Sequence, residues 1–190
     1  MIVRSMLAYV FWHWPRRGID SAAYEATQRR FHAALGTEPP PGFLSSRSVA
    51  IAGAPWAAGG GAAYEDWYLT GGSAALDPLD HAAVTAGRQQ PHAEAAAAAA
   101  DGTAGLYRLR RGEDDAAAGW SVWFAKPAGM SYAGLYQLLE PLVTAERAAL
   151  WGRQMVLGPT PEFCLHARRT PKLPAGLQGL VLARRLVWPG

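Results

Sequence analysis

The residues best suited to chemistry are one histidine and a short acidic run set among aromatic side chains. His13 lies near the end of an aromatic segment, and Glu65 and Asp66 lie between Tyr64 and Trp67. An imidazole beside a carboxylate can exchange a proton with an enolisable or phenolic substrate, because the carboxylate fixes the tautomer of the ring and raises its basicity. We therefore predict that His13 is an acid–base residue and that Asp66 or Glu65 orients it. The alternative is a hydrogen-bonded structural pair at the rim of a sheet.

The side chains near this pair are mainly aromatic, which is typical of a pocket for an apolar molecule. Side chains alternate between the two faces of a strand, so Tyr9 shares a face with His13, and Tyr64 and Tyr68 share a face with Asp66. If these faces line the pocket, the pocket contains the acid–base pair. If they face helices, the pocket is lined by the opposite set, namely Trp12, Trp14, Glu65 and Trp67. The residues predicted to bind substrate are Tyr9, Tyr64, Trp67, Tyr68, Arg153 and His166.

Two of these substrate-binding candidates come from the second half of the chain. Arg153 follows Trp151 and could bind a substrate carboxylate, or could simply extend its charge into water at the start of a strand. His166 alternates with Cys164 along a predicted strand, and its face could reach the pocket. Cys164 itself is expected to be a small buried apolar residue rather than a nucleophile.

The other histidines are expected to have structural or surface positions. His32 follows Phe31 on a predicted helix and is expected to flank its packed stripe, whereas His81 and His92 are expected at the surface. Local ligand spacing of the H-E-x-x-H kind is missing from the sequence, and one cysteine cannot form a cysteine zinc cluster. We therefore predict neither a metal nor a cofactor.

The elements that position these residues occur twice along the chain. In both halves an aromatic strand is followed by a proline, a glycine and a residue suited to cap a helix. Pro15 and Pro127 are 112 residues apart, and Gly18 and Gly129 are 111 apart. This near-constant offset predicts two copies of one unit, in residues 1–112 and 116–190, joined by the acidic turn 113–115.

The first copy is predicted to be complete and the second to be shortened. The predicted elements of the first are strands at 7–14, 42–52, 64–69 and 106–109, a helix at 21–35, and helical pieces at 78–86 and 92–100. This β-α-β-β-α-β order is that of a ferredoxin-like unit. The second copy is predicted to have strands at 120–126, 155–157, 163–166 and 180–187, and a helix after Ser131. Residues 170–176 are too few for a packed helix with its connections, so we predict that the second helix of this copy is lost.

The strands of both copies are apolar on both faces, which decides how the copies pack. A sheet with one face in water alternates apolar and polar residues, whereas the segments AYVFWHW and WSVWF do not. Each sheet is therefore predicted to be covered on one face by helices and on the other by the sheet of the partner copy. The predicted fold class is α+β, with two fused ferredoxin-like repeats packed sheet to sheet.

The chain resembles the dimeric α/β-barrel superfamily. The resemblance rests on a β-α-β-β unit that opens with an aromatic strand and a Pro/Gly turn, that is present twice, and whose two copies are paired through their sheets. That group includes monooxygenases of the antibiotic-biosynthesis type, muconolactone-isomerase-like proteins and proteins similar to the ether-degradation protein EthD. The resemblance implies a pocket for an apolar small molecule between the sheets, often without a cofactor. We therefore expect a cofactor-independent enzyme of the isomerase, cyclase or monooxygenase type; the alternative is a non-catalytic binding or structural module with a filled barrel.

The composition indicates the cellular compartment and the class of partner molecule. Half of the 190 residues are hydrophobic and only 17% are charged, which argues against a disordered chain. The net charge of +3 is carried by short basic pairs rather than a basic stripe, so no nucleic-acid partner is expected. The sequence predicts no signal peptide or membrane span, and its single cysteine suits a reducing compartment. We expect a cytoplasmic monomer or homodimer that binds a small apolar or aromatic molecule.

Overall fold

The computed structural model describes residues 6–188, which form an α+β fold around one large antiparallel sheet. The elements of the first half are β1 (Leu7–Pro15), α1 (Ser21–Thr37), β2 (Phe43–Ala52), β3 (Ala62–Thr70), α2 (Leu76–Ala83), α3 (Gln89–Ala98) and β4 (Ala99–Gly112). The elements of the second half are β5 (Trp120–Phe124), α4 (Tyr132–Glu146), β6 (Ala149–Arg153), β7 (Phe163–Ala167), β8 (Gly179–Ala183) and β9 (Arg185–Trp188). Short 3-10 turns lie at 58–60, 73–75 and 86–88.

The two halves share a nine-stranded sheet in the order β8-β5-β7-β6-β4-β1-β3-β2-β9. The halves meet where β4 pairs with β6. The first and last strands of the order, β8 and β9, are separated in the chain by Arg184 alone. Because β8 pairs with β5 and β9 pairs with β2, this one segment joins both ends of the sheet. The sheet therefore curls into a barrel, and one face of each half turns inward.

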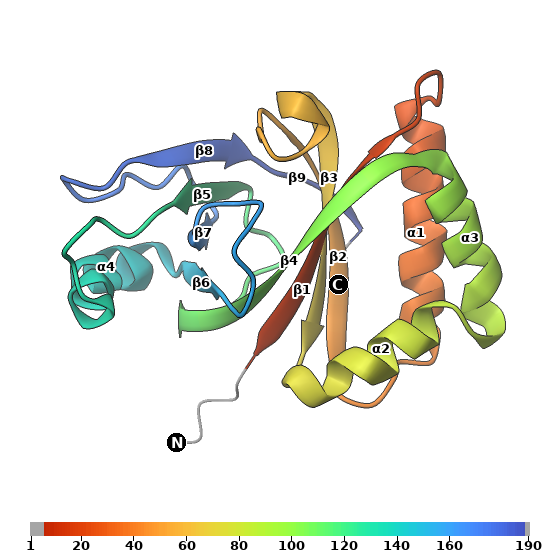
Figure 1. Ribbon diagram of the computed structural model, residues 1–190, viewed down its shortest axis with the longest axis horizontal. Coiled ribbons are helices and arrows are strands. Elements are labelled where there is room, and N and C mark those ends of the chain that lie inside the picture. Colours follow the sequence, from red (N-terminus) through yellow and green to blue (C-terminus); the bar gives the residue numbers. More distant parts are fainter. Residues whose placement is uncertain (1–5, 189–190) are drawn as a thin grey trace.

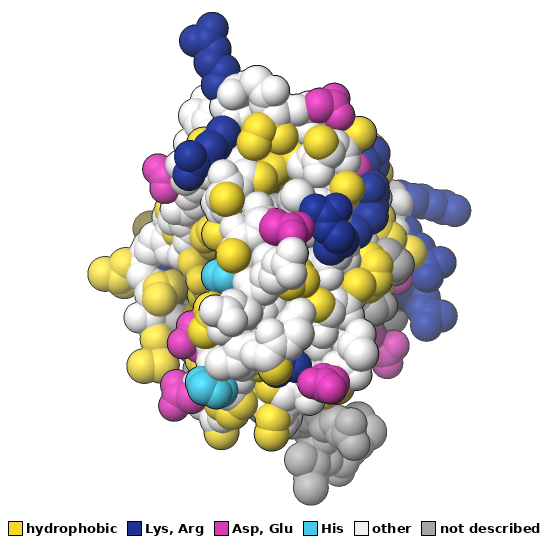
Figure 2. All heavy atoms as spheres, turned by 90° about the vertical axis from the view of Figure 1, so that its right-hand side faces the viewer, with side chains coloured by type: hydrophobic (Ala, Val, Ile, Leu, Met, Phe, Trp, Pro, Cys, Tyr) yellow, Lys and Arg dark blue, Asp and Glu magenta, His cyan; other side chains and the backbone are white. Residues whose placement is uncertain are grey.

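Helices cover the outer face of the barrel. In Figure 1, α1, α2 and α3 lie on one side of β1 to β4, and α4 lies beside the second set of strands. Asp20 caps α1, because its carboxylate accepts hydrogen bonds from the backbone N–H groups of Ala22 and Ala23 at 3.0 and 3.2 Å. On the helix-covered face, acidic and basic side chains are scattered among apolar ones (Figure 2). None of the helices within residues 6–188 is long and apolar enough to cross a membrane.

Tryptophan side chains from both halves fill the inside of the barrel. Trp12 of β1 lies 5.6 Å from Trp123 of β5, and Trp67 of β3 lies 5.3 Å from Trp151 of β6, measured between ring centroids. All four rings are fully buried. This inter-half core explains why these strands carry apolar residues on both faces, and it confirms the predicted sheet-to-sheet packing.

Most predicted elements are confirmed, but one strand was predicted in the wrong place. The expected strand at 155–157 is a connection, and the real strand β6 covers Ala149–Arg153. Met155 and Leu157 are 92% and 93% exposed, whereas Leu150 and Trp151 are buried. Helix α4 ends at Glu146 and is capped by Arg147 in the left-handed conformation, so the chain turns into the sheet earlier than the apolar pattern suggested. In addition, β4 begins at Ala99, and the expected final strand is interrupted at Arg184.

The second copy lacks its second helix, as predicted. Within the described residues, the chain between β7 and β8 contains turns and extended backbone but no helix. As a result, α2 and α3 have no counterpart beside the second set of strands (Figure 1).

Candidate functional site

A cavity of about 770 Å³ lies between the first-half sheet and its helices. Its floor is formed by β1 and β3, and its walls by α1, α2 and α3, with β4 at one edge. This volume falls in the range of pockets that bind drug-sized ligands. The side chains that form its walls are mostly aromatic or aliphatic, among them Tyr9, Phe11, Phe31, Leu35, Tyr68 and Leu79. The outward-facing set of strand residues therefore lines the pocket, and it does so opposite helices.

The pocket does not lie between the two sheets, as the resemblance had led us to expect. The space between the sheets is occupied by the tryptophan core, in which Trp12 and Trp67 have no exposed surface. Side chains of this size, contributed from both halves, fill the barrel interior. The opposite faces of the same strands lie beneath α1 and α3, and the cavity lies between these strands and helices.

At the floor of the cavity, one carboxylate contacts two imidazoles. Oδ2 of Asp66 lies 3.1 Å from Nε2 of His13 and 3.2 Å from Nε2 of His32. The hydroxyl of Tyr68 donates a hydrogen bond to the same oxygen at 3.1 Å. All four side chains are buried, and Asp66, His13 and Tyr68 border the cavity. The register of the sheet explains the contact, because β1 and β3 are antiparallel neighbours and His13 is paired with Tyr64.

Each imidazole is held at its other nitrogen by a hydroxyl group. Nδ1 of His13 lies 2.6 Å from the hydroxyl of Tyr24, and Nδ1 of His32 lies 2.7 Å from Oγ of Ser46. We assign the neutral tautomer with the proton on Nε2, toward the carboxylate, so that both hydroxyls donate to Nδ1. Burial and the charge of Asp66 raise the pKa of Tyr24, which keeps its hydroxyl protonated and able to donate.

The carboxyl of Asp66 is ionised in this environment. Burial alone would raise its pKa, but the electrostatic interactions and hydrogen bonds with His13 and His32 outweigh burial and lower the pKa well below its ordinary value. The same carboxylate and burial raise the pKa of Tyr68. The carboxylate of Asp66 accepts the Nε2 proton of His13 and so fixes the orientation of that ring.

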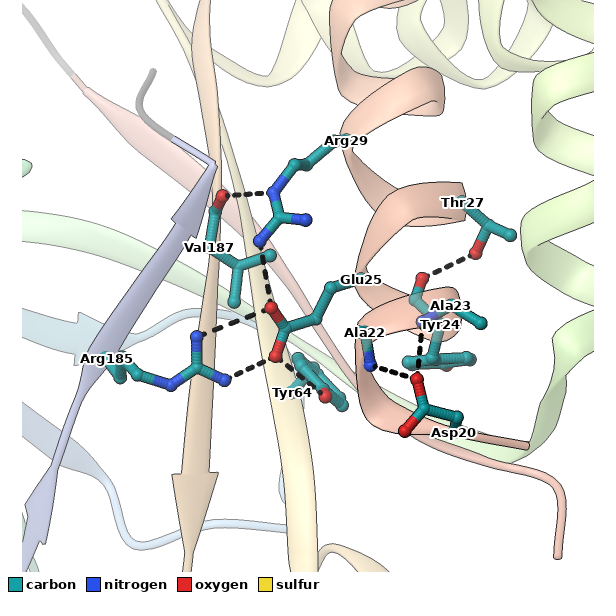
Figure 3. A network of polar contacts seen from close by, with 10 residues as sticks. All are labelled: Asp20, Ala22, Ala23, Tyr24, Glu25, Thr27, Arg29, Tyr64, Arg185 and Val187. Atoms are coloured by element: carbon teal, nitrogen blue, oxygen red, sulfur yellow. Dashed lines mark hydrogen bonds and ion pairs between the residues drawn. The ribbon is translucent and has the colours of Figure 1, made fainter. Parts of the chain in front are cut away.

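Helix α1, which carries Tyr24 and His32, is fixed to the sheet by a second polar network (Figure 3). Glu25 accepts a hydrogen bond from Arg29 of the same helix at 2.9 Å and from the hydroxyl of Tyr64 of β3 at 3.2 Å. It also pairs with Arg185 of β9. The hydrogen bond from Arg185 outweighs burial and lowers the pKa of Glu25, while burial and Glu25 raise the pKa of Tyr64 to about 12. The last strand of the chain thus helps to position the cavity wall.

The structure brings some of the predicted site residues to the cavity and places others elsewhere. His13, Asp66, Tyr9 and Tyr68 line it. Tyr64 stacks on the ring of His13, with centroids 5.7 Å apart, and supports the site from behind.

Four further predicted residues lie outside the cavity. Glu65 accepts hydrogen bonds from Trp12 and Trp67 inside the barrel at 3.0 and 3.2 Å, so it cannot orient His13. His166 lies in the same core, with its ring 4.4 Å from that of Trp67, and burial lowers its pKa well below the ordinary value. Arg153 donates a hydrogen bond to the backbone carbonyl of Thr160. The alternation of strand faces explains this separation, because Glu65 and Trp67 point opposite to Asp66.

Sequence reasoning missed three residues of the site. His32 is part of the Asp66 cluster rather than a flank of the helix stripe, and His92 and Gln28 line the cavity. The signal was the spacing of four residues between Tyr24, Gln28 and His32, which places polar groups on one face of α1 in an otherwise apolar stripe. In the described part of the chain, no three His, Cys, Asp or Glu side chains form a group able to hold a metal ion.

No family model matches the chain, and no curated protein matches its sequence. Solved structures do resemble it. A candidate monooxygenase from Fusobacterium nucleatum superposes with a TM-score of 0.63 at 6% identity, over 98% of this chain and 94% of that one. A candidate chlorite dismutase has a TM-score of 0.50 at 9% identity, over 96% of this chain and 94% of its own. An anthrone oxidase-like protein has a TM-score of 0.50 at 8% identity, over 96% and 91%.

Identity this low shows the fold alone. These solved structures are ferredoxin-like α/β-barrel proteins, and they superpose on nearly the whole of this chain. The chain therefore has the dimeric α/β-barrel fold, with both ferredoxin-like units fused in one polypeptide.

Proposed function

We propose that the chain is a cofactor-independent enzyme that removes a proton from an apolar or aromatic small molecule bound in the helix-side cavity. The observation that carries this proposal is the contact of His13 with Asp66 at 3.1 Å, in the wall of a cavity lined by aromatic side chains. His13 is the general base and acts through the Tyr24 hydroxyl that donates to its Nδ1, while Asp66 orients the ring and balances the charge that it gains. Isomerisation, cyclisation and oxygenation of an enolisable or phenolic substrate can all begin with this proton transfer.

The burial of the pair supports a catalytic role over a purely structural one. One acceptor oxygen is enough to hold a single histidine in a structural hydrogen bond. Here the buried carboxylate contacts two imidazoles and one hydroxyl, which is a larger cluster than that role requires. The aromatic walls exclude water, which strengthens electrostatic interactions with a bound substrate. The names of two structural neighbours, a candidate monooxygenase and an anthrone oxidase-like protein, support the same class of chemistry as a fold-level analogy.

The alternative is a binding module without catalysis. The observation in its favour is the barrel interior, which tryptophans fill, as that alternative requires. The helix-side cavity would then store or carry its ligand, and the Asp66 cluster would serve only to stabilise the floor.

Proton exchange distinguishes the two functions without knowledge of the natural substrate. The probe is 2-tetralone, an aromatic ketone with acidic C–H bonds, and the measurement is the loss of its α-proton signals by NMR in deuterated buffer. The wild-type chain should accelerate the loss, and His13→Ala should reduce that acceleration by about 100-fold or more, as is usual for a general base. Circular dichroism and the melting temperature report whether the variant still folds. Exchange at the buffer rate in the presence of bound ketone would refute the enzyme and leave the binding module.

A further inference from the structure

The side-chain amide of Gln28 is a polar group that the Asp66 cluster does not use. Gln28 is 3% exposed and lines the cavity. No hydrogen bond joins its amide to another residue within 6–188, and the amide nitrogen and oxygen are not among the fully enclosed polar atoms, so they open onto the cavity. An amide carries two donor hydrogens and one acceptor oxygen, which a polar ligand in the cavity can meet. A bound molecule with a polar atom would supply the missing partner.

Helix geometry places this amide opposite the proposed base. Tyr24, Gln28 and His32 are four residues apart, so they follow one another along one face of α1 with about 6 Å between neighbours. Tyr24 contacts His13, and His32 contacts Asp66. Gln28 therefore lies between two residues that both reach the His13–Asp66 pair. A ligand atom held by the amide would be next to the base.

Other hydrogen-bond donors deep in the cavity are already engaged. The hydroxyl of Tyr24 is directed to His13, and that of Tyr68 to Asp66. Tyr9 is 37% exposed and belongs to the outer part of the cavity. Gln28 is thus a buried neutral donor that faces the cavity and is free to bind an oxygen atom.

The charges around the cavity indicate whether the ligand oxygen belongs to a neutral group or to a carboxylate. Four aspartates line it, namely Asp66, Asp77, Asp80 and Asp101. Among the described lining residues, Arg16 is the only arginine or lysine, and its Nε donates to the backbone carbonyl of Ala99 at 2.9 Å. A carboxylate ligand would meet repulsion from these aspartates, whereas a neutral ketone or hydroxyl group would not.

We infer that Gln28 binds the oxygen atom of a neutral aromatic ketone or phenol and that the acidic lining excludes aromatic carboxylates. This inference rests on the proposed function for its site, and it names the substrate class. The Tyr24 hydroxyl, which lines the cavity, takes a proton from the carbon next to the ketone as it gives its own proton to Nδ1 of His13. The C–H electron pair then forms a C=C bond, and the carbonyl π pair moves to the carbonyl oxygen, which becomes an enolate. The amide N–H of Gln28 stabilises the charge on that oxygen.

Binding of three matched probes tests the inference by isothermal titration calorimetry. The probes are 2-tetralone, the hydrocarbon tetralin and the carboxylate of tetralin-2-carboxylic acid. The wild type should bind the ketone more tightly than the hydrocarbon and should bind the carboxylate most weakly. Gln28→Leu should weaken ketone binding by about tenfold, as expected for one hydrogen bond, and leave tetralin binding unchanged.

The control is Gln137→Leu, which makes the same change at an exposed position of α4 and should alter no affinity. Equal ketone affinity in the wild type and Gln28→Leu would overturn the role of Gln28. Tight binding of the carboxylate, or no binding of the ketone by the wild type, would overturn the substrate class. If the ketone binds through Gln28 but its protons do not exchange, the proposed enzyme fails and the inference about the ligand stands.

Discussion

Replacing Asp66 by Asn should strongly destabilise the fold, because its carboxylate is the common partner of three buried groups. The substitution keeps the size of the side chain and one acceptor oxygen, so Tyr68 can still donate its hydrogen bond. It removes the negative charge that lies 3.1 and 3.2 Å from the two imidazoles. Two hydrogen bonds from imidazole N–H groups to this carboxylate contribute about 1.5–3 kcal/mol each, or about 3–6 kcal/mol together. We expect a loss near the lower limit, about 3 kcal/mol, since the amide still accepts one hydrogen bond.

Urea unfolding followed by tryptophan fluorescence measures this loss. Unfolding should be measured at pH 8, where unfolded histidines are neutral because their ordinary pKa is about 6.5. The control is Asp80→Asn at the exposed rim of the cavity, which should change the free energy of unfolding by less than about 0.5 kcal/mol. A loss of about 3 kcal/mol is a large share of a typical stability of 5–15 kcal/mol. If Asp66→Asn were as stable as the wild type within about 1 kcal/mol, the carboxylate would not hold the cluster together.

Two further substitutions test the cavity wall and the cavity itself. Glu25→Gln removes a carboxylate whose pKa is lowered in the folded protein. The stabilisation from the charged carboxylate is complete above the ordinary glutamate pKa of about 4.3 and is lost as the pH falls through the lower folded value. Urea unfolding should therefore show a loss of about 1–3 kcal/mol at pH 7 and a smaller loss at pH 3, and an equal loss at both would contradict this electrostatic origin. Ala95→Phe places a ring into the cavity from α3 and should weaken 2-tetralone binding by more than tenfold in calorimetry, whereas Ala97→Phe on the exposed side of that helix should not; unchanged binding in Ala95→Phe would mean that the ketone binds elsewhere.

The sequence was sufficient to predict the duplicated unit and the pairing of His13 with a carboxylate at 65 or 66, because both follow from periodicities; the structure identifies that carboxylate as Asp66. The prolines and glycines repeat at one offset, and antiparallel neighbours in a ferredoxin-like order bring the end of β1 to the start of β3. The position of the cavity could not be predicted in the same way. Strand periodicity separates Asp66 from Glu65, but it does not say which face meets helices and which meets the other half.

The residues that were missed belong to an element whose rotation and depth depend on tertiary contacts. His32 reaches Asp66 because α1 is fixed over the sheet, and the fixing groups include Arg185, which is 160 residues from Glu25 in the chain. The strand at 149–153 was missed because the exposed run Met155 to Leu157 carries a stronger apolar signal than Ala149 to Arg153. In both cases the deciding contact is long-range, and local patterns contain no information about it.

The two halves show why this unit can form either a filled core or a cavity. In the second half, α4 directs Leu135, Leu139 and Val143 at the strands, and these side chains join a continuous apolar cluster with β5, β6 and β7. In the first half, α1 presents Tyr24, Gln28 and His32 along part of its inner face, and α2 and α3 provide further walls. Polar groups on that face cannot be packed against apolar strands without partners, so they meet the Asp66 cluster on one side and the cavity on the other. Loss of the second helix in the second half removes the wall that such a cavity would need. One half of the duplicated unit therefore packs a continuous apolar core beneath its helix, and the other encloses a cavity beneath its helices.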